Sequence, residues 1–200
     1  SLLSLPARGE GEEGSMVQTI RRKLTVAGDP AVGKTALVQM FHSMGQRFPK
    51  HYLMTLGVEF CMKTVSVADT DCNVELHIFD TAGQDIYGDM LPSYWEGTEA
   101  VMLVYDVTRV HTLEACANWY GRLLESLGKD ALPGVLVANK MDLRERLVVK
   151  RQDGQAMAQQ LGLKFVETSC MDGQDVDAPF QALAGLVQAD NADDGMMQLT

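Results

Sequence analysis

The chain of 200 residues is 46% hydrophobic, which is enough for one domain to bury a substantial core. Its 27 acidic and 17 basic side chains give a formal net charge of -10, and no stretch gathers the lysines and arginines that follow a nucleic-acid backbone. We therefore expect no nucleic-acid partner. No apolar run approaches the roughly 20 residues that span a bilayer, so we also expect no membrane-spanning segment.

The cysteines and histidines show neither a disulfide pattern nor a metal-binding pattern. The four cysteines lie far apart and form no CxxC pair, which predicts free thiols in a reducing, cytoplasmic setting. The four histidines also lack the spacing of metal ligands. Residues 198–200 include no cysteine to carry a prenyl group. We therefore expect the protein to reach its site of action by binding another protein and not through a lipid anchor.

Composition and the spacing of apolar residues divide the chain into three parts. Residues 1–19 mix glycine with glutamate and show no apolar period, which predicts a disordered acidic arm. Beyond them, short apolar runs alternate with segments in which apolar residues recur every three or four positions. We expect one domain over residues 20–190 and a flexible tail over residues 191–200.

The apolar runs predict six strands, at residues 23–27, 58–67, 74–80, 100–107, 135–139 and 164–168. Two segments between them place apolar side chains on one helical face, and these are Leu37, Met40, Phe41 and Met44 in the first and Leu113, Ala117, Tyr120 and Leu124 in the second. The alternation predicts an α/β fold with a doubly wound, mostly parallel six-stranded sheet and helices on both faces. Ligands of such folds bind at the carboxyl ends of the strands.

Residues 28–35, GDPAVGKT, match the pattern G-x-x-x-x-G-K-[ST] and stand between a predicted strand and a predicted helix. Such a P-loop turns its backbone N–H groups toward one point, and the helix N-terminus adds to the attraction for phosphates. The pattern predicts a P-loop NTPase in which Lys34 reaches the β- and γ-phosphates and the Thr35 hydroxyl binds Mg²⁺. Contacts to the nucleotide are expected from Asp29, Pro30, Ala31, Val32, Gly33, Lys34, Thr35 and Ala36.

A P-loop alone is also compatible with an ATPase or a nucleoside kinase, and a second motif separates these classes. Residues 139–142, NKMD, follow an apolar strand. The carboxylate of Asp142 is suited to accept hydrogen bonds from N1–H and the exocyclic amine of guanine, a donor pair that adenine lacks. With Asn139 and Lys140 it predicts a site for GTP or GDP. A kinase is disfavoured because no segment indicates a lid or an acceptor site.

A third motif, DTAGQ at residues 80–84, also follows an apolar strand. Asp80 is placed to hold Mg²⁺, Gly83 to donate its N–H to the γ-phosphate, and Gln84 to orient the attacking water. Thr55 precedes the strand predicted at 58–67, where its hydroxyl would complete the Mg²⁺ coordination only with GTP bound. The expected metal ligands are Thr35, Thr55 and Asp80, and the expected catalytic residues are Lys34, Thr55 and Gln84.

Together these motifs resemble the Ras superfamily over residues 23 to about 190. The strings LGVEF, QDIY and YWEG are most similar to the Rab branch. The runs at 28–37, 74–80, 132–140 and 177–180 are more similar still to the Rab-like small GTPases of the intraflagellar transport B complex. This resemblance implies work in a cilium or flagellum, with a small β-sandwich subunit of that complex as the partner.

The resemblance also implies roles for residues that the motifs alone do not assign. Phe48 would stack on the guanine base. Thr168, Ser169 and Cys170 stand where small GTPases carry a loop whose backbone N–H meets the guanine carbonyl, with Cys170 in place of the usual alanine. We interpret Cys170 as a small packed residue and not as a reactive thiol.

Pro30 departs from the glycine or small residue that many Ras and Rab proteins carry at its position, near the path of an activating protein's arginine. The nucleotide-facing motifs contain no arginine finger, so we expect slow intrinsic hydrolysis. Two hypotheses stay open. One is a GTPase switch, in intraflagellar transport or in vesicle traffic, which Gln84 favours. The other is a binding subunit whose nucleotide mainly stabilises the fold, for which Pro30 and the missing prenylation cysteine leave room.

Overall fold

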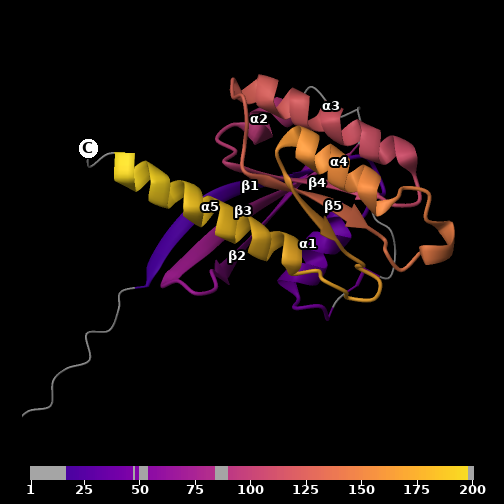
Figure 1. The fold of residues 1–200 in the computed structure, drawn as a ribbon, viewed down its shortest axis with the longest axis horizontal. Coiled ribbons are helices and arrows are strands. Elements are labelled where there is room, and N and C mark those ends of the chain that lie inside the picture. The colour runs from indigo at the N-terminus through magenta and orange to yellow at the C-terminus, as the bar shows by residue number, and fades with distance from the viewer. Residues whose placement is uncertain (1–16, 47, 50–53, 84–89, 198–200) are drawn as a thin grey trace, which may run out of the picture.

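A single six-stranded sheet forms the centre of the structure. The computed structural model describes residues 17–46, 48–49, 54–83 and 90–197 (Figure 1). The strands are β1 (Gln18–Ala27), β2 (Val58–Ser66), β3 (Cys72–Thr81), β4 (Ala100–Asp106), β5 (Gly134–Asn139) and β6 (Lys164–Glu167), in the spatial order β2-β3-β1-β4-β5-β6. Strand β2 runs antiparallel to β3, and the remaining neighbours are parallel. The predicted α/β fold with a mostly parallel six-stranded sheet is confirmed.

Helices cover both faces of this sheet. They are α1 (Lys34–His42), α2 (Leu91–Trp95), α3 (Val110–Leu127), α4 (Arg151–Leu161) and α5 (Ala178–Met197), with a 3₁₀ turn, η2, at Arg144–Arg146. One core lies under α1 and α5, where the rings of Phe41 and Phe180 stack with centroids 3.7 Å apart. A second core lies under α3 and α4, with α2 packed beside α3. Every residue of β4 and β5 is buried, because apolar helices pack on both sides of them.

The strand order places the candidate site. Strand β1 lies between β3 and β4. The chain adds β2 and β3 on one side of β1 and then β4, β5 and β6 on the other. The carboxyl ends of β1, β3, β4 and β5 meet at one edge. A ligand crevice is expected outside these ends, at the point where the order reverses. The P-loop leaves β1 at that point.

The structure corrects three boundaries. Strand β1 begins at Gln18, so Gln18 and Thr19 belong to the sheet and not to the predicted arm, of which residues 1–16 lie outside the described ranges. Helix α5 continues to Met197, so residues 191–197 are helical and not a flexible tail. Met44 lies beyond the end of α1, has a positive φ of 55° and is 73% exposed, so it does not belong to the apolar face of that helix.

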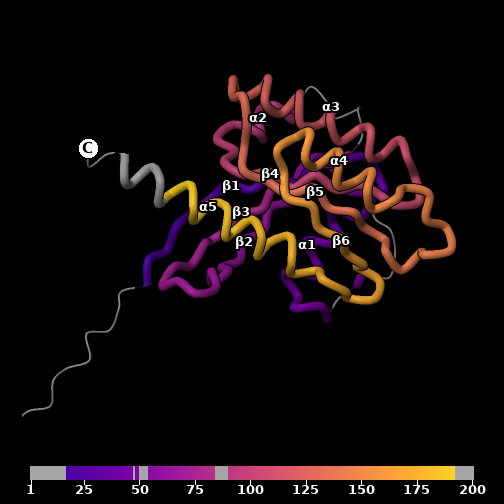
Figure 2. The backbone as a smooth tube through the Cα atoms, in the orientation of Figure 1, coloured from indigo at the N-terminus to yellow at the C-terminus, as the bar shows by residue number. Residues whose placement is uncertain are grey.

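The two ends of the domain lie on the same side of the molecule (Figure 2). A hydrogen bond of 2.9 Å from Arg22 Nη2 to Asn191 Oδ1 joins the beginning of β1 to α5. None of the helices within the described ranges is long and apolar enough to cross a membrane.

Candidate nucleotide site

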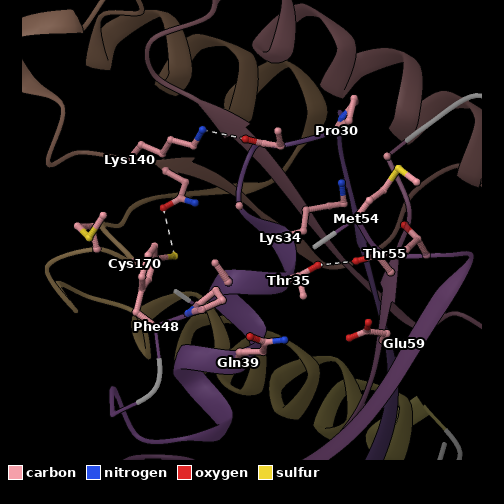
Figure 3. Close-up of a pocket in the computed structure, with 18 of the residues that line it drawn as sticks. Pro30, Lys34, Thr35, Gln39, Phe48, Met54, Thr55, Glu59, Lys140 and Cys170 are labelled. Carbon is pink, nitrogen blue, oxygen red and sulfur yellow. Dashed lines mark hydrogen bonds between the residues drawn. The ribbon is translucent and has the colours of Figure 1, made fainter. Parts of the chain in front are cut away.

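A pocket of about 540 Å³ opens at the carboxyl edge of the sheet. The P-loop, the segments before β2 and the loops after β5 and β6 line it. In Figure 3, Phe48 and Cys170 lie at one end, Thr55 and Glu59 lie at the other, and Thr35 lies between them. The expected base-stacking Phe48 and the Thr55 hydroxyl expected to bind the metal therefore lie at opposite ends of one pocket, with Thr35 between them.

Backbone geometry shapes the P-loop. Ala31 has a φ of 59° and Gly33 a φ of 102°, so the chain makes left-handed steps just before α1. Such steps turn successive N–H groups inward and form a concave site for anions. A Cβ on Gly33 would lie 2.3 Å from Asn139 Nδ2, and that amide donates to the Val32 carbonyl at 2.9 Å. Gly33 thus lets the expected guanine-binding segment approach the P-loop closely.

Lys34 is buried over this cradle. Its Nζ donates to the carbonyl oxygens of Gly28 at 2.7 Å and Asp29 at 2.9 Å. Burial lowers the pKa of Lys34 to about 8, against the opposite effect of the Asp80 and Asp29 carboxylates. A phosphate in the cradle would supply the negative charge that stabilises the ammonium form.

Three oxygen-bearing side chains, those of Thr35, Thr55 and Asp80, meet beside the part of the pocket that Thr35 and Thr55 line. The Thr35 hydroxyl lies 2.8 Å from the Thr55 hydroxyl and donates to Asp80 Oδ2 at 2.5 Å. Asp80 Oδ1 is buried with no hydrogen-bond partner among the described residues. Burial raises the pKa of Asp80 to about 6, against the hydrogen bond from Thr35 and the charge of Lys34.

This arrangement fits a Mg²⁺ ion. Hydroxyl and carboxylate oxygens are the ligands that Mg²⁺ prefers, and a cation would supply the missing partner of Asp80 Oδ1. The described ranges contain no group of three or more histidine, cysteine or acidic side chains arranged to hold a metal. A magnesium ion here would therefore depend on Thr35 and Thr55 together with Asp80 and the phosphates.

The segments expected to bind guanine are the loops after β5 and β6. Ser169 Oγ donates to Asp142 Oδ1 at 2.8 Å, which fixes the orientation of that carboxylate. The buried Asn139 side chain accepts from Thr168 Oγ1 and Cys170 Sγ, at 3.2 and 3.4 Å. Phe48, 37% exposed, lines the same pocket. A carboxylate fixed beside an aromatic ring is suited to a planar base with two N–H donors.

Cys170 has the environment of a packed residue. It is buried, and burial raises the pKa of its thiol to about 12, against the hydrogen bond to Asn139. This supports the predicted packing role over a reactive thiol. All four cysteines are free thiols.

Sequence reasoning missed a carboxylate behind the P-loop. Asp106 Oδ2 accepts from Lys140 Nζ at 2.6 Å and from Arg109 Nε at 3.1 Å. The same two cations donate to the P-loop carbonyls, Lys140 to Ala31 at 2.8 Å and Arg109 Nη2 to Pro30 at 3.2 Å. Burial acts to raise the pKa of Asp106, but the bonds from Lys140 and Thr108 outweigh it and hold that pKa below its usual value. The available signal was an acid closing the otherwise apolar strand β4.

Most of the predicted site residues line or adjoin this one pocket. Gly83 lies against the P-loop, Val32 turns its side chain into the core, and Asp29 faces α3. Gln84 lies outside the described residues.

A P-loop, hydroxyl and carboxylate groups suited to a metal and a carboxylate suited to guanine, gathered around one pocket, are the features of a small GTPase. Residues 23–189 match the Ras family, and the chain belongs to that family. It is 46% identical to the intraflagellar transport protein 27 homolog of Mus musculus over 162 residues, which cover 81% of this chain and 87% of the mouse protein. It is 42% identical to intraflagellar transport protein 27 of Chlamydomonas reinhardtii over 171 residues, covering 83% of each. Identity to the Ras-related protein RabC of Dictyostelium discoideum is 33% over 174 residues, covering 87% of each.

Proposed function

We propose that this protein is a GTPase of intraflagellar transport that binds GTP or GDP with Mg²⁺ and hydrolyses GTP slowly. The observation that carries the proposal is one pocket lined by Asp142 and Cys170 as well as by Thr35 and Thr55, with the Thr35 and Thr55 hydroxyls 2.8 Å apart. The similarity to intraflagellar transport proteins 27 supports the cellular setting, a cilium or flagellum.

The residues that the motifs single out have separate roles in this proposal. The loop from Asp29 to Ala36 binds the phosphates through its N–H groups, and Lys34 moves from the Gly28 and Asp29 carbonyls to the β- and γ-phosphates. Asp142, with Asn139, Lys140 and Ser169, binds the guanine, and Phe48 and Cys170 pack beside it. Thr35, Thr55 and Asp80 hold the Mg²⁺, which neutralises charge on the phosphates. Gln84 orients the attacking water and Gly83 binds the γ-phosphate.

Single-turnover hydrolysis tests the enzymatic part. We expect a rate constant of about 10⁻⁴ to 10⁻² s⁻¹, the range typical of the intrinsic hydrolysis of these switches. Gln84→Leu should lower that rate while leaving GTP affinity largely unchanged. A variant that turns over GTP as fast as the parent protein would show that Gln84 does not orient the water.

A second candidate is a binding subunit in which nucleotide mainly stabilises the fold. Pro30 favours it, because this exposed residue stands at the rim of the pocket and its carbonyl is already bonded to Arg109. In that case hydrolysis would be below the range given above, and nucleotide removal would lower the unfolding temperature sharply.

The proposed partner is a small β-sandwich subunit of the intraflagellar transport B complex. A permanent subunit need not release its partner at each hydrolysis event, so we place that contact largely outside the loops of Thr55 and Gln84. Co-purification with GDP and with a non-hydrolysable GTP analogue tests this. Equal recovery in both states is expected, and binding that disappears in one state would contradict it.

A further inference from the structure

Helix α3 is bonded directly to the phosphate-binding loop. Trp119 Nε1 donates to Asp29 Oδ1 at 3.0 Å, and Trp119 is only 4% exposed. One residue further along the P-loop, the Pro30 carbonyl accepts the bond from Arg109, which immediately precedes α3. Two successive residues of the loop are therefore held by side chains from the same part of the chain.

Gly83 packs on the same short stretch of the P-loop. A Cβ on Gly83 would lie 2.5 Å from the carbonyl carbon of Asp29 and from the nitrogen of Pro30, and 2.6 Å from the Gly28 oxygen. Only a glycine allows this approach, because such distances are far inside van der Waals contact. The Asp29–Pro30 peptide thus contacts Gly83, which binds the γ-phosphate in the proposed function. The Asp29 side chain contacts Trp119 of α3.

Trp119 is itself held firmly in place. The Arg122 guanidinium lies 5.1 Å from the centroid of a Trp119 ring and 5.9 Å from that of Trp95 in α2. Cations at such distances are attracted to indole rings. The Trp119 side chain therefore joins α3 to the P-loop, and Arg122 lies over both Trp119 and Trp95 of α2.

We infer that Trp119 is a positioning residue that couples α3 to the γ-phosphate through Asp29 and Gly83. The inference rests on the proposed function, because it requires that the pocket alternate between GDP and GTP. With GTP, Gly83 must be fixed against the Asp29–Pro30 peptide for its N–H to reach the γ-phosphate. With GDP, that contact is not needed. An Asp29–Pro30 peptide held by Trp119 therefore raises the affinity for GTP relative to GDP. By the same coupling, exchange of GDP for GTP changes the surroundings of Trp119 in α3.

The chain provides a matched control for this role. It has two tryptophans, and the second, Trp95, is also buried and also lies under Arg122. Trp95 Nε1 has no hydrogen-bond partner among the described residues. Replacing either ring by phenylalanine removes similar packing, but only Trp119→Phe removes a bond to the P-loop.

The test is the ¹H–¹⁵N spectrum of the two indole groups in the full chain, recorded with GDP and with a non-hydrolysable GTP analogue. Either Trp95→Phe or Trp119→Phe suffices to assign the two signals. We expect the Trp119 signal to move between the two states and the Trp95 signal to stay in place. An unmoved Trp119 signal, or equal movement of both signals, would overturn the inference.

Affinity measurements give an independent readout. Trp119→Phe should lower the affinity for the GTP analogue relative to GDP by about threefold to tenfold, part of the value of one charge-assisted hydrogen bond. Trp95→Phe should leave this ratio unchanged. If Trp119→Phe binds each nucleotide and the affinity ratio is unchanged, the inference is overturned and the proposed function still stands. Failure of the parent protein to bind either nucleotide would overturn the proposed function.

Discussion

The hydroxyl of Thr55 lies 2.8 Å from the hydroxyl of Thr35, although one precedes β2 and the other stands in the first turn of α1. Thr35 in turn bonds to Asp80 at the end region of β3. Three segments that are far apart in the sequence thus place oxygen atoms around one point. In the proposed switch, Thr55 is the member that leaves when the γ-phosphate is lost.

Thr55→Ala should weaken the binding of Mg²⁺ and GTP more than the binding of GDP, because it removes a ligand used in the GTP state. We expect a loss of about 1 to 2 kcal/mol in GTP binding, the value of one hydroxyl contact to a charged partner. Titration of fluorescent nucleotides in Mg²⁺ measures both affinities. Thr64→Ala, at an exposed position of β2, is the control and should change neither. Equal losses for GTP and GDP in Thr55→Ala would argue against a switch at this residue.

Asp106→Ala should destabilise the domain and loosen the P-loop. The change leaves Lys140 and Arg109 without their shared acceptor, and we expect the free energy of unfolding to fall by about 2 kcal/mol, since both cations keep some access to water. Urea denaturation of nucleotide-saturated protein measures this. Arg21→Ala breaks a pair with Glu75 in which the arginine side chain is 76% exposed, and should change the free energy of unfolding little. Similar values for the two variants would contradict a structural role for Asp106.

The fold was predictable where apolar pattern and burial coincide. Strands β4 and β5 are buried on both faces, so nearly every residue in them is apolar and their positions are evident in the sequence. The beginning of β1 was missed because Gln18, Arg21 and Arg22 are polar, and parallel pairing with β3 holds them in the sheet. Backbone pairing of that kind produces no apolar pattern in the sequence.

The site was predictable where a motif encodes its own local geometry, as in the P-loop. The roles of Asp106 and Trp119 were not predictable in this way. Asp106 acts on Lys140 and Arg109, and Trp119 acts on Asp29, through contacts made only after β4, α3 and the P-loop pack together. A lone acid or tryptophan carries no spacing signal for such contacts.

Cys170 should react slowly with alkylating agents although it lines the pocket. With a pKa of about 12, its thiolate fraction at pH 8 is small and rises about tenfold per pH unit. At pH 8, iodoacetamide should modify Cys170 much more slowly in the native protein than in urea, where the pKa returns to its ordinary value. Mass spectrometry of the Cys170 peptide measures this, with half-buried Cys61 as an internal comparison. Equal rates with and without urea would indicate an activated thiol.

Asp142→Asn should weaken guanine nucleotide binding by at least tenfold, because an amide cannot accept both guanine donors without turning its own NH₂ toward one of them. Ser169 fixes the carboxylate through its hydroxyl, so Ser169→Ala should produce a smaller loss in the same assay. Competition between GDP and ADP for the pocket gives the specificity directly. An Asn variant that binds GDP as tightly as the parent would remove Asp142 from the base site.

Identification of the nucleotide held by the purified protein tests the central claim most directly. Protein purified in Mg²⁺ is denatured, and the released small molecules are separated by ion-exchange chromatography against nucleotide standards. We expect GDP or GTP in an amount approaching one per chain. Adenine nucleotides in their place, or no nucleotide and no uptake of added GDP, would contradict the claim that this pocket is a guanine nucleotide site.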